Sequence, residues 1–469
     1  MSNREPNVRL AALLTEANWS AATLAHQVNT AGAAHGVTLT YNRSTVAHWL
    51  GGSRPRHPVP ALVASVLSRR CGRLITPQET GLVPTPAHAP LMADRARGPG
   101  ATARLTDLCR ADVDPARRAE TARAVFSPTD PHRPTREHPG PAARPKPFVR
   151  LDSGRRATSA DSRTTREMTQ SFADLAARHG GRRVRTWLGL YLAEDAGHLP
   201  DASSSNDLRR QLLVDVAQLA HLLADMTADS GHPGLARKYF EASLDLADEA
   251  GNDRMHAITL RAMSVQAMRL GHHDHAFELA DAAVTRAGSA SDHPVMAFLL
   301  TQRAHTAAIT GRARPARTDL AAAERHHNRS QAAPPGAFTT YTPAALHFRT
   351  GQTFRALRDP ANALTSLQAA RHRTPPSRRA TALTEATVAE TLADMGHLEA
   401  ACTHWNLFLD LYPHLASTEV EHARTRMRQT LRRFPRQQHS TPLRRRDRAL
   451  SALTTAPDPR TPPIPTSEP

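Results

Sequence analysis

The sequence contains very little lysine: Lys146 and Lys238 are the two lysines among 60 basic residues, and the rest are arginine. A Walker A phosphate-binding loop requires a glycine-rich turn that ends in Gly-Lys followed by Ser or Thr. Neither lysine stands in such a turn, which excludes this class of nucleotide-binding protein. The arginine bias is also typical of GC-rich codon usage, so the net charge of +17 is weak evidence for a nucleic-acid partner by itself.

Cysteines and long apolar segments are scarce as well. Cys71, Cys109 and Cys402 lie far apart in the sequence and form no Cys-x-x-Cys pair, which argues against a disulfide framework or a thiolate zinc site. No apolar run approaches the roughly 18 residues of a membrane span, and the N-terminal residues lack the apolar core of a signal peptide. We therefore expect a cytoplasmic protein without a membrane partner.

Aromatic residues make up only 4% of the 469 residues, which favours thin layers of Ala- and Leu-rich helices over a sandwich or barrel. Prolines concentrate between the folded blocks and at the C-terminus, where they predict linker and tail. We predict an all-α protein with a small domain at 1–82, a disordered Pro/Arg-rich linker at 83–165, an α-solenoid at 166–434 and a disordered basic tail at 435–469. Within the linker, residues of about 101–124 are expected to be locally helical, with an interruption at Pro115.

The positive charge is distributed unevenly. Residues 1–80 carry +5, 81–170 carry +6, 171–413 carry zero and 414–469 carry +6. The predicted solenoid is therefore neutral, which argues against it as a nucleic-acid surface.

The first block predicts a small helical bundle. Leu10, Leu13 and Leu14 form one apolar stripe, and Ser20 is placed to cap a second helix. After an irregular stretch, Asn42 is placed to cap a third helix over 43–50, which stops at Gly51-Gly52.

The third helix has a polar outer side if Val46, Trp49 and Leu50 face the core. The residues expected on that side are of types that reach base edges or phosphates in a major groove. Two arginines that follow the helix lie within reach of the phosphate backbone. The predicted DNA-binding residues are Arg43, Ser44, Thr45, His48, Arg54 and Arg56.

This block resembles the Cro/repressor-like helix-turn-helix. The resemblance is carried by Ser20-AATLAHQVN and by Asn42-RSTVAHWLGG, which follow that family's Ser-capped helix and its Ser-x-x-Val-x-x-Trp-x-x-Gly pattern. It implies that Arg43, Ser44, Thr45 and His48 occupy base-reading positions, and hence that the partner is double-stranded DNA. The turn departs from the family because Gly32–Tyr41 expands it; a bundle without a DNA role is the alternative.

The second block contains a repeat. Small residues recur at Ala236, Ala276, Ala316, Ala363 and Ala401, with spacings of 40, 40, 47 and 38, and a glycine precedes each by five residues, except that Arg358 stands there once. Four positions after each of these alanines stands a residue that is large in four repeats and small in one: Phe240, Ala280, Leu320, Leu367 and Trp405. A further small residue stands twelve positions before each alanine. Such columns are typical of helical hairpins that cross closely at small residues.

The repeats resemble tetratricopeptide repeats, whose small, small, aromatic, small order these columns follow. The resemblance implies an α-solenoid whose groove binds a partner protein or peptide, or the chain's own linker. Use of the block to pair two copies of the chain is the alternative. We expect the helices near 168–178 and 182–195 to cap the N-terminal end of the array.

Nothing in the sequence indicates catalysis. No His-Glu-x-x-His helix and no Gly-x-Ser-x-Gly elbow occurs. The cluster from His272 to His275 falls in a predicted inter-helix turn, where we expect solvated side chains and no metal site. We expect a non-enzymatic protein without cofactor or metal.

Taken together, the two blocks resemble actinobacterial transcriptional regulators with a helix-turn-helix and tetratricopeptide-like repeats, such as the regulators of sporulation and antibiotic production in Streptomyces-type bacteria. This implies a sequence-specific DNA-binding regulator that acts at the nucleoid. The alternative is a protein-interaction adaptor that does not bind DNA, which gains if the Gly32–Tyr41 insertion covers the outer face of the third helix.

Overall fold

The structure is a computed structural model that describes residues 6–34, 37–56, 58–71, 75, 77, 79–83, 100–128, 156–203, 205–288, 292–330, 338, 341–372, 377–434 and 439–455. Within these residues the regular elements are helices, and the one strand-like feature is an isolated bridge between Ala157 and Ser203. The predicted all-α fold is confirmed. No helix of the described chain is long and apolar enough to cross a membrane.

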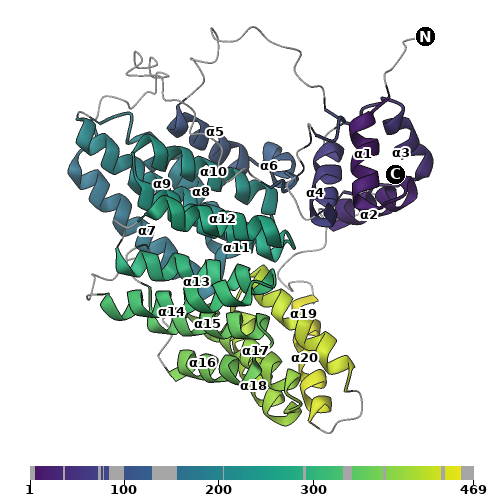
Figure 1. The fold of residues 1–469 in the computed structure, drawn as a ribbon. Helices are drawn as coiled ribbons and strands as arrows, with labels where there is room; N and C mark the ends of the chain where they lie inside the picture. Colours follow the sequence, from purple (N-terminus) through teal and green to yellow (C-terminus); the bar gives the residue numbers. More distant parts are fainter. Residues whose placement is uncertain are drawn as a thin grey trace, which may run out of the picture.

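The N-terminal residues form a small module, shown in purple in Figure 1. Its apolar stripes meet in one core, in which Leu10, Leu24, Val46 and Leu62 are fully buried. The helices of the module are α1 (Val8–Ala17), α2 (Ala21–Ala34), α3 (Arg43–Leu50) and α4 (Val59–Cys71).

The repeat region is a stack of five helical hairpins, which run in order from teal to green in Figure 1. The hairpins are α9 (Asn206–Asp229) with α10 (Pro233–Glu249), α11 (Asp253–Arg269) with α12 (His273–Ala287), α13 (His293–Ile309) with α14 (Ala313–Arg329), α15 (Pro343–Ala356) with α16 (Pro360–His372), and α17 (Arg378–Asp394) with α18 (Leu398–Leu411). The odd-numbered helices pack on one another along the series, while the even-numbered ones make far fewer such contacts. The odd-numbered helices therefore line the inner face of the curve.

The small residues of the repeat lie where the two helices of each hairpin cross. Ser264 Oγ donates to the Ala276 carbonyl at 2.7 Å, so the two columns touch directly. A Cβ atom added at Gly351 would come within 2.6 Å of Leu367 Cγ, so this crossing requires glycine. The repeat-packing residues are all less than a tenth exposed: Ala236, Phe240, Ala276, Ala280, Ala316, Leu320, Ala363, Leu367, Ala401 and Trp405.

The turn within each hairpin depends on left-handed backbone. The glycine that begins this turn has a φ of +86° at Gly231 and +83° at Gly271. Arg358 occupies the same place in the fourth hairpin with a φ of +58°. For a residue with a Cβ atom this conformation costs about 1–2 kcal/mol.

Replacing Arg358 with glycine is expected to stabilise the protein. Relief of the left-handed strain exceeds the added chain entropy of glycine, so we expect the free energy of unfolding to rise by about 0.5–1 kcal/mol in urea titration. Arg358→Ala removes the same exposed side chain and keeps the strain, so it should leave stability nearly unchanged. An equal gain in both variants would contradict the backbone explanation.

Residues 101–122 are helical, as expected within the linker, but they are packed on the repeat domain and are not part of a disordered segment. They form α5 (Ala101–Val113) and α6 (Pro115–Ala122), and α5 packs on α10 and on α8 (Gly181–Glu194). Leu105 and Cys109, four residues apart, are fully buried against these helices. Asp112 accepts hydrogen bonds from Arg185 and from the Tyr239 hydroxyl, the latter at 2.9 Å. The remaining prolines of the predicted linker lie mostly outside the described residues.

The predicted disordered tail also contains a helix. After α19 (Thr418–Arg432), α20 (Ser440–Thr455) packs on α18 and α19. Arg424 Nε donates to Asp447, and both side chains are 7% exposed. Leu443 is buried in the same core. This arginine-rich segment is therefore folded, because a carboxylate on α20 neutralises arginines of α19. Residues 456–469 lie outside the described residues.

The two ends of the array touch each other. The helix α7 (Ser159–His179) and α8 were expected to cap the N-terminal end, but α7 also packs on α17. The Ser377 hydroxyl donates to the Ala177 carbonyl, and the Ala416 amide donates to the His179 carbonyl, both at 2.9 Å. The inner face of the stack is therefore partly closed by the chain itself.

An ion-pair network joins these ends. Glu419, at the start of α19, accepts from Arg269 of α11 at 2.6 Å and from Arg379 of α17 at 2.5 Å. Arg379 also pairs with Asp229 of α9 at 3.2 Å. Burial alone would raise the pKa of Glu419, but the surrounding arginines, Arg269 and Arg379 foremost, lower it from 4.5 to about 2.

The Glu419 network should make stability depend on pH. Because the folded-state pKa is depressed, the stabilisation is present above pH 4.5, the unfolded value, and is lost as pH falls toward 2. At neutral pH we expect Glu419→Gln to lower the free energy of unfolding by about 1–3 kcal/mol, and the deficit to shrink as pH falls through this range. Denaturant titrations across pH measure it. Glu421→Gln, which removes a more exposed pair with Arg182, is the control and should cost less than about 1 kcal/mol.

A short segment after α6 joins the module to the stack. Val125 is buried in the core of the module, while Phe126 is buried in the core of the repeats. A Cβ atom at Gly234 would overlap the Ala124 carbonyl, so this close approach requires glycine. The Phe126 ring lies 5.3 Å from the His272 ring.

The expectation of a solvated turn at His272–His275 is wrong for two of its residues. His272 is 6% exposed and His275 is 5% exposed. The reason is tertiary: the 124–126 segment and the end of α4 cover this turn. Burial, followed by the nearby charge of Arg69, lowers the pKa of His272 from 6.5 to about 3. Within the described residues no group of three His, Cys, Asp or Glu side chains is placed to hold a metal ion.

Candidate nucleic-acid interface

Helix α3 is fixed at both ends. Asn42 accepts from the Thr45 amide at 3.0 Å, and the Thr45 hydroxyl returns a contact to the Asn42 amide in a capping box. At the other end the Leu50 carbonyl accepts from the Asn7 amide at 2.7 Å. Val46 and Trp49 are buried beneath the helix. The outer face of α3 therefore has a defined orientation in the module.

The helix before it begins as expected. The Thr23 amide donates to Ser20 Oγ at 3.1 Å, which is an N-cap contact for α2. Its side chains Leu24 and Val28 are fully buried, so α2 packs beneath α3.

The insertion predicted at Gly32–Tyr41 begins within α2, which continues to Ala34, and its later part is anchored to the core side of the module. The Asn29 amide group donates to the Tyr41 carbonyl at 2.8 Å and accepts from the Tyr41 amide at 3.0 Å. The Tyr41 ring packs edge-on against Trp49 at 5.2 Å. Leu39 packs against Gly32, where a Cβ atom would overlap it. The described part of the insertion thus leaves the outer face of α3 uncovered.

The polar face of α3 is exposed to solvent. Arg43, Ser44, Ala47 and His48 are exposed. Thr45 is half-buried, and its hydroxyl is engaged with Asn42. Of the four residues expected to read bases, Arg43, Ser44 and His48 are therefore available, whereas Thr45 positions the helix.

The predicted phosphate-contacting arginines follow α3. Arg54 and Arg56 are both exposed in the segment that leads to α4. Within the described part of the chain, neither they nor Arg43 has a carboxylate partner. Three uncompensated positive charges thus flank one exposed helix, which is the electrostatic requirement for binding a polyanion.

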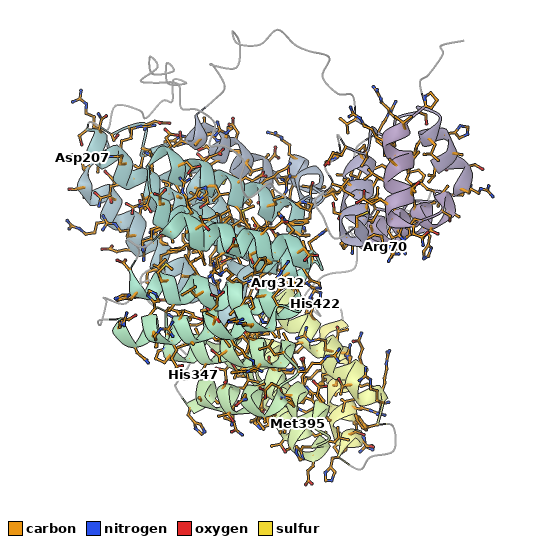
Figure 2. The ribbon with its side chains drawn as sticks, viewed as in Figure 1. Arg70, Asp207, Arg312, His347, Met395 and His422 are labelled. Atoms are coloured by element: carbon orange, nitrogen blue, oxygen red, sulfur yellow. The ribbon has the colours of Figure 1, made fainter. Side chains whose placement is uncertain are left out.

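The module presents α3 away from the repeats. Figure 1 shows α3 at the outer edge of the module and α4 on the side that faces the stack. Arg70, near the end of α4, lies at the base of the module in Figure 2, where its Nε donates to the Ala17 carbonyl at 2.9 Å. Arg70 therefore makes a contact inside the module. Because α3 lies on the side away from the repeats, a long ligand could reach it without contacting them.

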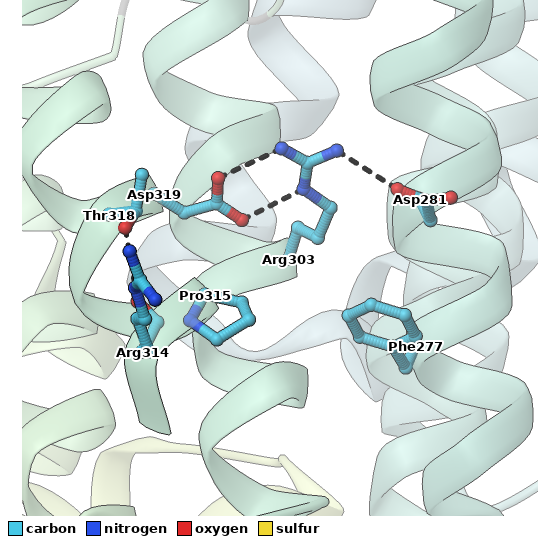
Figure 3. Close-up of a pocket in the computed structure, with 7 residues that line it drawn as sticks. All are labelled: Phe277, Asp281, Arg303, Arg314, Pro315, Thr318 and Asp319. Atoms are coloured by element: carbon cyan, nitrogen blue, oxygen red, sulfur yellow. Dashed lines mark hydrogen bonds and ion pairs between the residues drawn. The ribbon is translucent and has the colours of Figure 1, made fainter. Parts of the chain in front are cut away.

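In a second surface feature, a pocket in the repeats, the central arginine is fully engaged by carboxylates. Figure 3 shows Arg303 between Asp319 and Asp281, with Phe277 and Pro315 beside it. Arg303 makes two bonds to Asp319 at 2.8 Å and one to Asp281 at 2.9 Å. These bonds, those to Asp319 foremost, raise its pKa. The guanidinium therefore joins α12, α13 and α14 and is not open to a ligand.

Residues 10–83 match the SP15 N-terminal domain family. The match covers the module, including α3 and both arginines that follow it. No curated protein matches the chain at a significant level.

Sequence reasoning missed Asn29, which holds the insertion in place. Its signal was present: a polar side chain one residue after the buried Val28, on an otherwise apolar side of α2. Its partner is a backbone twelve residues away, which no local pattern indicates.

Asn29→Ala should loosen the insertion. Loss of both hydrogen bonds leaves the Tyr41 amide and carbonyl unpaired, which costs about 1–3 kcal/mol. We expect faster hydrogen exchange in residues 37–42, measured by mass spectrometry, than in the wild type. Thr30→Ala is the control, because Thr30 is exposed and its hydroxyl bonds only within α2 in the described structure. Unchanged exchange in Asn29→Ala would show that the clamp does not hold the insertion.

Proposed function

We propose that this protein is a sequence-specific DNA-binding transcriptional regulator in which α3 enters the major groove. The observation that carries the proposal is the uncovered face of Arg43, Ser44 and His48 on a helix fixed at both ends. Arginine reads guanine with two hydrogen bonds in the major groove, and Ser and His supply further donors and acceptors. Arg54 and Arg56 supply phosphate contacts. The protein would act in the cytoplasm, at the nucleoid.

The resemblance to regulators of sporulation and antibiotic production supports genes of those programmes as the targets. The repeat domain would bind a protein or peptide partner or pair two copies of the chain. On α8, Trp187 is 64% exposed and Leu190, one turn further, is 51% exposed, which favours a protein partner. The same exposed pair also supports the second candidate function, that of a protein-interaction adaptor that does not bind DNA.

A gel-shift experiment with the full chain tests DNA binding. A duplex is first selected from a random pool, and its affinity is then measured for the wild type and for Arg43→Ala/His48→Ala. Loss of base contacts worth about 1–3 kcal/mol each should weaken binding at least tenfold. Arg325→Ala, an exposed arginine on α14, is the control and should bind within about twofold of the wild type. No salt-sensitive binding, or equal effects in both variants, would favour the adaptor.

The arginines after α3 should behave differently. Arg54→Ala and Arg56→Ala should weaken selected and unrelated duplexes alike, and each should reduce the slope of log affinity against log salt by about one unit. A loss confined to the selected duplex would instead show that these arginines read bases.

A further inference from the structure

Two arginines on the inner face of the repeats have no carboxylate within ion-pair distance among the described residues. Arg261 on α11 lies over the Phe298 ring, with its guanidinium carbon 3.5 Å from the ring centroid. Its Nε donates to the Phe298 carbonyl at 3.1 Å. In the described structure its two terminal nitrogens have no acceptor. The stacking and the Nε bond fix the plane of the fork and leave its outer edge open.

Arg349 on α15 lies in the same region, one turn after Ala345, whose carbonyl accepts from the Tyr341 hydroxyl at 3.3 Å, and the Tyr341 ring packs on Phe298. In the part of the chain that the structure describes, its guanidinium has no hydrogen-bond acceptor and no carboxylate within ion-pair distance; Glu419 acts on it only through its charge. Burial lowers its pKa, and burial together with the charge of Arg349 lowers the pKa of Arg261 to about 9. Each guanidinium is thus held in a partly desolvated place beside another positive charge, which is unfavourable unless an anion joins them.

The nearby carboxylates do not supply that anion. Glu419 is bonded to Arg269 and Arg379. Asp225 lies 3.5 Å from His221, and its negative charge also acts on Arg261. Burial would raise the pKa of Asp225, but the hydrogen bond from His221, with the charges of Arg269 and Arg261, keeps it low. Both carboxylates are therefore engaged with other cations, and they act on Arg261 and Arg349 through charge without a hydrogen bond to either.

A buried histidine adds an unsatisfied polar atom. His305 on α13, two turns after Phe298, is 7% exposed, and its Nδ1 has no hydrogen-bond partner among the described residues. Burial and the charges of Arg349 and Arg261 hold its pKa far below the usual value, so the ring is neutral at pH 7. Tyr341 closes the region on one side, since its hydroxyl is bonded to Thr301 at 3.0 Å and its ring contacts Phe298.

We propose that Arg261 and Arg349, with His305 beside them, form an anion-binding site on the inner face of the repeat domain that takes a carboxylate or a phosphoryl group. A planar guanidinium fork fixed by stacking is suited to both groups, because each presents two oxygens to parallel N–H donors. The site joins α11, α13 and α15, so an occupant would bridge three successive hairpins. This site is separate from the module and does not depend on the proposed DNA binding.

Isothermal titration calorimetry of the full chain with inorganic phosphate and with acetate, each against sodium chloride at equal ionic strength, tests the site. We expect phosphate to bind the wild type, and Arg261→Gln and Arg349→Gln each to weaken binding at least tenfold. Arg325→Gln makes the same charge change on α14 and should stay within twofold. Binding of both probes indicates a site that also accepts carboxylates, and binding of phosphate alone indicates a phosphoryl site; either supports the proposal.

Equal weakening in all three variants, or no binding of either probe, would overturn the proposal. Thermal unfolding without added anion gives an independent reading. Because burial outweighs the attraction of Glu419 and lowers the pKa of Arg349, its charge is a net cost in the free protein, and Arg349→Gln should melt at the same temperature as the wild type or higher. A lower melting temperature would show that the chain itself satisfies Arg349, and it would overturn the proposal as well.

Discussion

The close crossing of two helices at small side chains is the constraint on which the repeat region depends. Where Ser264 meets the Ala276 carbonyl, or where Gly351 admits Leu367, a larger side chain would separate the helices. Because every hairpin crosses in this way, the odd-numbered helices can pack along one inner face and the stack can curve. That curvature brings α7 and α9 to α17 and α19, so that Arg379 and Glu419 can join repeats that are far apart in the chain.

The same curvature gives the chain two charged surfaces of different character. The inner face concentrates arginines from several hairpins, most of them paired with carboxylates. The module carries its arginines on one exposed helix and the segment after it, where the structure describes no paired acid. The positive charge is therefore not spread evenly over the repeat region and the module. The net charge of the whole chain says little about the charge of either surface.

Much of the fold could be predicted because its signals are local and periodic. The spacing of Val46 and Trp49 was sufficient to define the buried side of α3, and the recurrent glycine was sufficient to locate each hairpin turn, including the one where Arg358 adopts the same backbone. The errors fell where proline and arginine content was taken as evidence of disorder. Leu105 and Cys109 on α5, and Asp447 on α20, gain their partners only from helices elsewhere in the chain.

The sequence by itself determined the helical class, the repeat columns and the polar face of α3, because each follows from side-chain spacing along one helix. Only the tertiary structure decided that the Thr45 hydroxyl is engaged in a capping box, that Asn29 holds the insertion off the outer face of α3, and that His272 is buried under Phe126. It also decided that Arg261 and Arg349 share one region. These outcomes depend on which segments meet in space, and burial and charge act over distances between helices that residue spacing does not encode.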